Sequence, residues 1–364
     1  MKTGKHARLV LTWAALILLA CQLAACSAGG TKSEPAKPET TPASQPQAPA
    51  QAPPQAPAQP AAPIVLKASS GDQDDYPAVK GLLKFAELVG QKTNGRVKVE
   101  VYTNGALYGD QQAEVEAAKA GTIAFSLPQV SVLSAWEPKA DFFVMPYLFK
   151  DVSHAERVLD SEIAAKIFGG LEANGLKVIA HLTGGGMRSF YNSKKPIKVP
   201  DDIKGLKLRT TKSPLANDAF VALGAIPTPI AWGELYAALQ QKVVDGAEHA
   251  PTDVLMYKFH EVCKYYSLDE HTYELMPLVA STKVLNGLPE DLRNTILECA
   301  KEVVPYVRNI AKEESAKALA EIEKKAVVVK DVDKDAFAEK VKAVNAKYAE
   351  KMGMDIFNAI NSMR

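Results

Sequence analysis

One arginine follows a stretch that favours a β-strand, in a position where ligand sites are common. In Gly205–Arg209 two leucines alternate with two basic residues, which is the pattern of a half-buried strand. Ser213 can cap a helix and Pro214 suits its first turn, so a helix should begin directly afterwards. Arg209 is therefore expected at the carboxyl end of a strand, where open α/β sheets place their ligand crevices. Its guanidinium could hold a carboxylate there through two parallel hydrogen bonds.

A single arginine is weak support for a binding site, because most such residues are surface charges or pair with a carboxylate of the fold. Enzymatic motifs give no competing signal. The six histidines do not form the His-Glu-x-x-His zinc pattern, and no Gly-x-Ser-x-Gly elbow occurs. These observations disfavour a lipid-anchored hydrolase, and no cofactor or metal site is expected.

The overall charge is nearly balanced, with 43 basic and 42 acidic residues. Nucleic-acid-binding proteins carry an excess of positive charge, so no nucleic-acid partner is expected.

The N-terminus has the composition of an export signal. Three basic residues precede an apolar stretch over residues 9–20, which is too short for a standard membrane-spanning helix. Leu23-Ala24-Ala25-Cys26 resembles a bacterial lipobox, in which the cysteine is lipidated and becomes the mature N-terminus. An ordinary secretory signal is the alternative. We predict a lipoprotein signal peptide over residues 1–26, with lipidation at Cys26.

Residues 27–63 are rich in proline, alanine and glutamine and have almost no large apolar side chains. Such a stretch cannot bury enough surface to offset its chain entropy, so it is expected to be a flexible tether. The tether and the anchor together predict a protein outside the cytoplasm, held at a membrane. Cys263 and Cys299 remain in the exported part, and the sequence leaves open whether they form a disulfide or are two buried thiols.

The globular part runs from residue 64 to residue 364, about 300 residues, which is enough for two modest domains. Its first third alternates between strand and helix patterns, which is typical of a parallel α/β sheet. Short strands are expected over residues 178–182 and 189–192. The triple glycine at 184–186 between them lacks the lysine of a phosphate-binding loop and is expected to be a flexible crossover.

Two further strands are expected over residues 262–268 and 278–281. The longest helical pattern extends from Pro289 to about Lys325, with Pro305 inside it. A proline there should kink the helix, and the length suggests a helix that spans more than one domain.

Several segments resemble, in order and spacing, the DctP-type solute-binding proteins of TRAP transporters (tripartite ATP-independent periplasmic transporters). The main segments are Gly205–Arg209, Ala222–Pro229, Glu234–Gln240 and Val244–Glu248. Shorter agreeing pieces are Thr93–Val97, Met145–Phe149 and Leu288–Leu292, so the resemblance covers residues 64–364.

This resemblance implies an α/β fold of two domains of the periplasmic-binding-protein type, with a ligand cleft between them and a long kinked helix spanning both. The implied domains are residues 64–185 with about 272–315, and residues 186–271 with about 316–364. The implied function is that of a binding protein, not an enzyme, that captures a small organic acid and delivers it to integral membrane TRAP subunits. A role in feeding a sensor or another importer remains an alternative.

The resemblance also implies site residues. Arg209 occupies the position of the arginine that pairs with the substrate carboxylate in most of the family, and Arg188 matches a second arginine at the cleft. Trp232 falls where an aromatic residue commonly lines the pocket, although from the sequence alone a core aromatic is the simpler interpretation.

Gln129 and Asp110 correspond to polar positions of the first domain near the ligand, and Asp110 is also a natural helix cap. His249 stands where many relatives carry an asparagine. This departure leaves the identity of the acid open among C4-dicarboxylates, keto acids, aromatic acids, sugar acids and amino acids.

Overall fold

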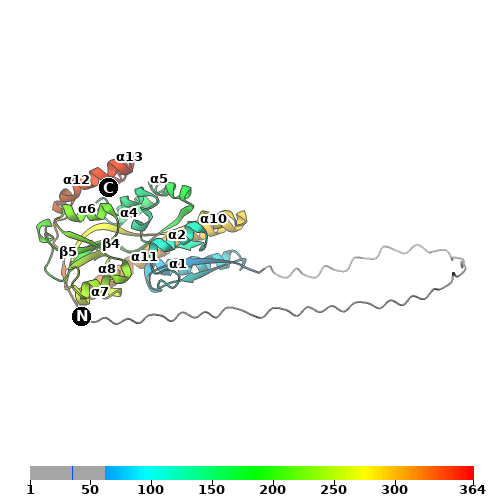
Figure 1. The fold of residues 1–364 in the computed structure, drawn as a ribbon, viewed down its shortest axis with the longest axis horizontal. Coiled ribbons are helices and arrows are strands. Elements are labelled where there is room, and N and C mark those ends of the chain that lie inside the picture. The colour runs from blue at the N-terminus through cyan, green and yellow to red at the C-terminus, as the bar shows by residue number, and fades with distance from the viewer. Residues whose placement is uncertain (1–34, 36–61) are drawn as a thin grey trace, which may run out of the picture. The chain divides into compact units, whose positions relative to one another are not determined.

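The computed structural model describes Pro35 and residues 62–364 (Figure 1). The predicted signal peptide, Cys26 and almost all of the predicted tether lie outside the described residues. From residue 62 onward, the described residues belong to one compact unit.

The strands that the structure describes form one mixed sheet of nine, in the order β2-β1-β3-β8-β4-β7-β5-β6, with β9 paired to β8. Their bounds are β1 (Ile64–Ser69), β2 (Val97–Tyr102), β3 (Phe125–Ser126), β4 (Leu176–Asn192), β5 (Lys207–Thr210), β6 (Ile226–Pro229), β7 (Gly246–His249), β8 (Tyr265–Ser281) and β9 (Val327–Val329). β1 pairs in parallel with β2 and β3, as the alternation of strands and helices predicts.

Two long antiparallel strands, β4 and β8, run through the whole sheet, and each has 17 residues. At one end β8 pairs with β3, through Val279 and Ala280, and at the other end β4 pairs with β7, through residues 189–192. We call the α/β layer around β1–β3 the first half and the layer around β5–β7 the second half. The two-part α/β fold class is therefore confirmed, whereas the predicted domain boundaries stay a prediction.

Four short strands were expected where β4 and β8 lie, and this expectation is wrong. The triple glycine is part of β4, at a register shift between Thr183 and Met187. A Cβ atom on Gly184 would lie 1.7 Å from Oη of Tyr76, and one on Gly185 would lie 2.1 Å from Oγ1 of Thr252. These glycines are therefore needed for close packing on both sides of a continuous strand.

Helices cover the sheet (Figure 1). The α-helices are α1 (Pro77–Lys92), α2 (Gln111–Ala120), α3 (Val130–Leu133), α4 (Val152–Leu159), α5 (Glu162–Phe168), α6 (Pro214–Ala222), α7 (Leu235–Gln240), α8 (Pro251–Met256), α9 (Phe259–Val262), α10 (Thr282–Asn286), α11 (Glu290–Ile322), α12 (Lys334–Met352) and α13 (Met354–Ser362). The 3₁₀-helices are η1 (Pro138–Phe143), η2 (Gly169–Asn174), η3 (Pro200–Asp202) and η4 (Trp232–Glu234). None of the helices in the described part of the chain combines the length and apolar character that crossing a bilayer requires.

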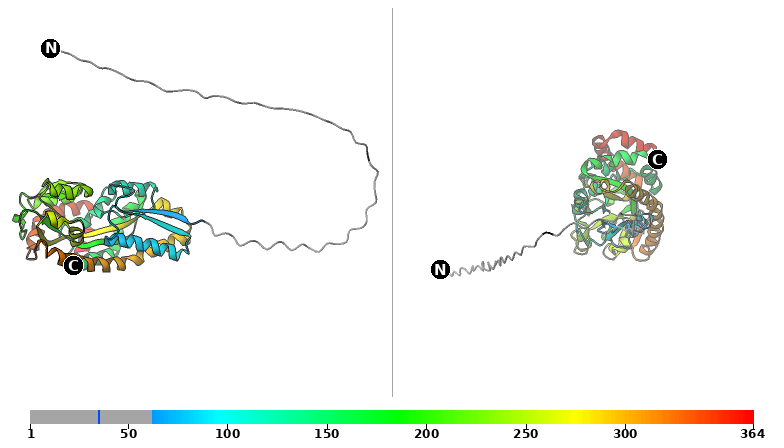
Figure 2. Two further views of the ribbon diagram at one scale, coloured as in Figure 1. Left: turned by 90° about the horizontal axis from the view of Figure 1, so that it is seen from below. Right: turned by 90° about the vertical axis from the view of Figure 1, so that its right-hand side faces the viewer.

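The predicted long helix is α11, which has 33 residues and contains Pro305. Figure 2 shows α11 lying along α1, and α11 also packs against β4 and α8. Val303 and Val307 of α11 are buried with the first half, and Ile322 near its end is buried with the second half. The helix therefore contacts both halves.

Cys263 and Cys299 are free thiols in the structure, and both are buried. Cys299 belongs to α11 and is buried in the core that this helix shares with α1, whereas Cys263 packs with residues of the second half such as Tyr191 and Phe259. Of the two alternatives that the sequence leaves open, the structure therefore has two buried thiols.

Helix α1 offers a test of the contact with α11. A Cβ atom on Gly81 would lie 2.3 Å from Cγ2 of Val307, so Gly81→Ala should force the two helices apart. We expect this substitution to lower the free energy of unfolding by about 1–3 kcal/mol, measured by chemical denaturation. Gly90→Ala on the same helix is the control, because a Cβ there would meet nothing within 4 Å and should be neutral or stabilising. Equal unfolding midpoints for the two variants would contradict this packing.

Candidate functional site

A cavity of about 780 Å³ lies between the two halves, within the size range of small-molecule sites. Its lining includes the residues just beyond β1 and β5 and the last residue of β7, so it lies at carboxyl ends of strands. All six residues that the sequence suggests for the site line this one cavity: Asp110, Gln129, Arg188, Arg209, Trp232 and His249. The structure thus brings them together, and their roles toward a ligand stay a prediction.

Arg209 is positioned as its local sequence predicts. It lies in β5, one residue before the end of the strand, and its backbone is opposite Thr228 of β6. The chain then turns into α6, where the Ser213 hydroxyl accepts a hydrogen bond from the Ala216 amide and Pro214 occupies the first turn. The predicted strand, turn and capped helix are therefore confirmed.

The Arg209 side chain is buried, with 5% of its surface exposed, and it has one hydrogen bond. Its Nε donates to the Ile230 carbonyl at 3.0 Å, and among the described residues neither terminal nitrogen has a hydrogen-bond or ion-pair partner. Burial lowers the pKa of Arg209, while Glu248 partly opposes this and the cation of Arg188 adds to it. A buried cation without a counterion is unfavourable, so this guanidinium is suited to receive an anion.

Arg188 lies in β4 and is in a different state, because the protein already occupies most of its donors. Its Nε and Nη2 donate to the two carboxylate oxygens of Glu248 at 2.6 and 2.9 Å, and Nη2 also donates to the Glu248 carbonyl at 2.9 Å. Its Nη1 donates to Oε1 of Glu274 at 2.7 Å. Burial acts to lower the pKa of Arg188, but the two glutamates raise it well above its ordinary value. The visible role of Arg188 is to neutralise and position these carboxylates.

A buried histidine extends this ion network. Nδ1 of His271 lies 2.6 Å from Oδ2 of Asp269, and its Nε2 lies 3.5 Å from Oε2 of Glu248. Burial alone would lower the pKa of His271, but Asp269 and Glu248 outweigh it and raise the pKa to about 9. His271 is therefore a cation at neutral pH.

Sequence reasoning missed four members of this network, namely Glu248, Asp269, His271 and Glu274. For two of them a signal was present in the sequence. Asp269 and His271 are two residues apart, the spacing of one face of a strand, but the expected strand ended at Leu268.

His249 and Trp232 lie together beside Arg209 in the cavity lining. The two rings have centroids 5.1 Å apart, and Tyr257 packs edge-on against Trp232 at 4.6 Å. Burial, with the nearby cation of Arg188, lowers the pKa of His249 well below its ordinary value, so its imidazole is neutral. Nδ1 shares a hydrogen bond with the Tyr191 hydroxyl at 3.0 Å, and within the described chain Nε2 has no partner.

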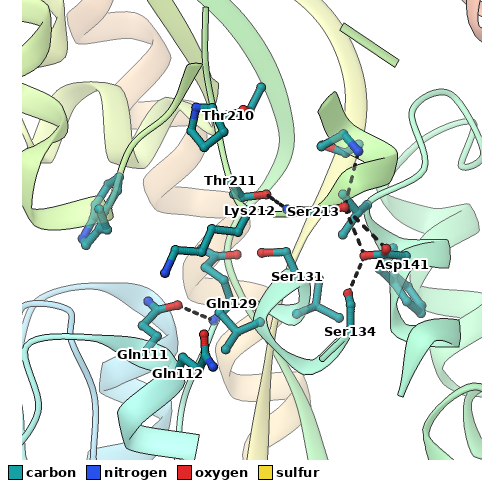
Figure 3. Close-up of a pocket in the computed structure, with 18 of the residues that line it drawn as sticks. Gln111, Gln112, Gln129, Ser131, Ser134, Asp141, Thr210, Thr211, Lys212 and Ser213 are labelled. Carbon is teal, nitrogen blue, oxygen red and sulfur yellow. Dashed lines mark hydrogen bonds between the residues drawn. The ribbon is translucent and has the colours of Figure 1, made fainter. Parts of the chain in front are cut away.

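The first half contributes amide and hydroxyl groups to the opposite wall (Figure 3). The side-chain Nε2 of Gln129 donates to Oε1 of Glu274 at 2.8 Å. The backbone N–H of Gln129 donates to Oε1 of Gln111 at 3.1 Å. Asp110 caps α2, since its Oδ1 accepts from the Gln112 and Ala113 amides at 2.9 and 3.1 Å. The predicted capping role of Asp110 is therefore confirmed.

Two contacts join the halves at the cavity. The Tyr257 hydroxyl donates to Oδ1 of Asp72 at 2.9 Å, and the Ser213 hydroxyl lies 3.4 Å from each oxygen of Asp141 (Figure 3). Burial raises the pKa of both Asp72 and Asp141 to about 6, partly opposed by these hydrogen bonds. Side chains from each half thus approach one another next to the space where a ligand would bind.

Comparison with known proteins identifies a family. The model for bacterial extracellular solute-binding proteins of family 7 (DctP) matches residues 68–351. The C4-dicarboxylate-binding periplasmic protein DctP of Rhodobacter capsulatus is 33% identical over 308 residues, covering 83% of this chain and 91% of the relative. The 2,3-diketo-L-gulonate-binding periplasmic protein YiaO of Escherichia coli is 32% identical over 257 residues, covering 70% and 78%.

Solved structures agree with this match. A TRAP periplasmic solute-binding protein from Roseobacter denitrificans with bound β-D-glucuronate has a TM-score of 0.78 and 30% identity, covering 81% of this chain and 98% of that one. The corresponding protein from Sulfurospirillum deleyianum with bound succinate has a TM-score of 0.77 and 29% identity, covering 83% and 100%.

The raised pKa of His271 predicts a pH dependence of stability. Its ordinary value of 6.5 rises to about 9, so the stabilisation is fully present below pH 6.5 and is lost as the pH rises through about 9. A pKa shift of this size contributes at most about 3 kcal/mol to the free energy of unfolding. We expect the melting temperature of the wild type to fall between pH 7 and 9.5 more steeply than that of His271→Gln.

His181→Gln is the matched control for this measurement. Burial lowers the pKa of His181 to about 4, so that ring stays neutral throughout the window and its replacement should leave the slope unchanged. Parallel pH profiles for the wild type and His271→Gln would show that His271 is not charged in the folded protein. A direct NMR titration of the imidazole provides a second measurement.

Proposed function

Because this chain belongs to the DctP family of bacterial extracellular solute-binding proteins, we propose that it captures a small organic acid outside the cytoplasm and delivers it to the membrane subunits of a TRAP-type transporter. The single observation that carries the proposal is the guanidinium of Arg209, which is buried at the cavity with no anion beside its terminal nitrogens in the described chain. In this role the protein binds its ligand without chemical turnover.

A carboxylate suits this guanidinium for geometric and electrostatic reasons. The two terminal nitrogens present parallel N–H groups that match the two oxygens of a carboxylate. The Ile230 carbonyl holds Nε at 3.0 Å and so fixes the plane of the group. Because Arg209 is already desolvated, pairing it with an anion recovers an interaction that the free protein lacks.

The relatives support an acid as the ligand while differing in the rest of the molecule. The printed names include a C4-dicarboxylate-binding protein and a 2,3-diketo-L-gulonate-binding protein, and the solved structures contain glucuronate or succinate. Each of these ligands has a carboxylate. We infer that the common carboxylate binds to Arg209 in this chain as well.

Each of the other site residues has a supporting role in this proposal. His249 offers Nε2 beside the carboxylate, and Trp232 provides a half-buried aromatic surface next to it. Arg188 keeps Glu248 neutralised, so that this glutamate does not occupy Arg209. Gln129 and Asp110 belong to the opposite wall, so a ligand held at Arg209 would bring the two halves together.

In our proposal, the N-terminal segment holds the protein at a membrane surface, where it binds its ligand. A lipid on Cys26 would anchor the protein outside the cytoplasm, and the proline-rich residues 27–63 would let the binding unit move between ligand capture and the transporter.

Replacement of Arg209 tests the binding role. Arg209→Ala should weaken the binding of an organic acid by about 100-fold or more in calorimetric titration, because it removes one partner of a buried charged pair. Arg209→Lys should give an intermediate loss, since it keeps the charge and loses the planar fork. Lys207→Ala is the control, because Lys207 lies in the same strand with an exposed side chain. Unchanged affinity in a folded Arg209→Ala protein would refute the assignment.

Replacement of Cys26 tests the anchor. In a bacterial host, the wild type should fractionate with membranes and carry a lipid on the residue that becomes the mature N-terminus, as seen by mass spectrometry. Cys26→Ser should release the protein from the membrane fraction without changing ligand affinity. Cys21→Ser is the matched control, since Cys21 lies in the segment that is removed. Membrane retention of Cys26→Ser together with loss for Cys21→Ser would place the anchor at the other cysteine.

A further inference from the structure

The positive charge of the cavity is confined to one side. Its basic residues are Arg188, Arg209, Lys212 and Lys351, with the imidazoles of His249 and His271. The lining residues between Gly71 and Pro146, which we call the first-half wall, include no lysine, arginine or histidine. This described wall instead has three aspartates: Asp72, Asp110 and Asp141. A second carboxylate placed there would meet like charges, and the wall itself has no basic residue to pair with it.

Among the residues that the structure describes, only one basic residue on the other side of the cavity is both buried and available to an anion. Arg188 and His271 are held by carboxylates of the protein. Lys212 and Lys351 are exposed, so water and salt screen their attraction for a ligand. Arg209 alone combines burial with free terminal nitrogens in the described chain. The cavity is therefore built for one desolvated carboxylate.

The first-half wall offers neutral hydrogen-bonding groups to the rest of the ligand. Among the described residues, Nε2 of Gln111, Oε1 of Gln129 and Oγ of Ser131 have no hydrogen-bond partner, and all three residues line the cavity (Figure 3). The other polar atom of each glutamine side chain is bound by the protein. Oε1 of Gln111 accepts from the backbone N–H of Gln129, and Nε2 of Gln129 donates to Oε1 of Glu274. A donor, an acceptor and a hydroxyl are thus presented in fixed positions.

Hydroxyl groups match this set better than methylene groups do. A hydroxyl both donates and accepts, so it can pair with an amide nitrogen, an amide oxygen or a serine. A plain hydrocarbon chain would displace water from these groups and leave them unpaired, which is unfavourable. Trp232 completes the arrangement, because its half-buried ring is fixed by Tyr257 and offers a flat apolar surface to the carbon face of a sugar.

From the positive charge on one side of the cavity and the amide and hydroxyl groups that the described first-half wall offers on the other, we propose that the ligand is a polyhydroxylated monocarboxylate, that is, a sugar acid. Its carboxylate binds Arg209 and its hydroxyls bind Gln111, Gln129 and Ser131. This inference rests on the proposed function of the same cavity and narrows it from organic acids in general to one class.

A matched set of six-carbon compounds tests the class. Calorimetric titration of the wild type should use D-gluconate, D-galactonate, D-glucuronate and D-galacturonate as sugar acids, with hexanoate, adipate and D-glucitol as comparisons. Hexanoate keeps the carboxylate without hydroxyls, adipate adds a second carboxylate, and D-glucitol has hydroxyls without a carboxylate. Two hydrogen bonds correspond to about 10-fold or more in affinity, so the best sugar acid should bind at least that much more tightly than each comparison compound.

Two variants assign the contacts. Ser131→Ala should raise the Kd for the best sugar acid by about 3- to 10-fold and leave the Kd for hexanoate unchanged, because it removes a hydroxyl contact alone. Lys212→Met should change the Kd for that sugar acid by less than about 3-fold, since an exposed lysine contributes little.

The outcomes separate this inference from the proposed function. Tighter binding of adipate than of every sugar acid, especially if lost in Lys212→Met, would overturn the sugar-acid class while leaving an acid-binding protein. Tighter binding of hexanoate than of every sugar acid would also overturn the sugar-acid class while leaving an acid-binding protein. Binding of D-glucitol alone, or of none of the acids, would overturn the proposed function and this inference with it.

Discussion

Arg188 links three adjacent strands through buried charges, because it lies in β4 and binds Glu248 of β7 and Glu274 of β8. His271, also in β8, adds a second cation to the same group of carboxylates. Removing one partner of a buried pair typically destabilises a protein by about 3–5 kcal/mol, since the remaining charge stays desolvated. The position of β7, and with it of His249 at the end of that strand, therefore depends on this network.

The same network explains why the terminal nitrogens of Arg209 have no partner among the described residues. Glu248 is the buried carboxylate that acts on the charge of Arg209, but its oxygens are already occupied by Arg188 and its neighbour His271. One arginine is thus satisfied inside the protein and the other is left facing the cavity. The two residues have the same chemistry, and only their partners decide that Arg188 supports the fold while Arg209 keeps free donors within the part of the chain that the structure describes.

Local sequence could predict the environment of Arg209 but not that of Arg188. The strand, turn and helix cap around Arg209 depend on neighbours within a few residues, and they were predicted correctly. The partners of Arg188 are 60 and 86 residues away, so no local pattern reports them. For the same reason the lengths of β4 and β8 were underestimated. Buried polar residues such as Asp269 and glycines such as Gly184 interrupt the apolar pattern, and only contacts from distant segments make them compatible with a strand.

The arrangement of the cavity makes the ligand the element that completes the interface between the halves. A desolvated cation on the second half is unfavourable without an anion, and in the described chain the half-buried amide and hydroxyl groups of the first half would lose their water to a ligand and then need partners on it. One molecule with a carboxylate at one end and hydroxyls along its length would satisfy both at once, which a contact with either half alone cannot do. The binding free energy is then available only when both walls are in place. In the proposed function, selectivity for the ligand and closure of the halves would therefore have the same physical origin.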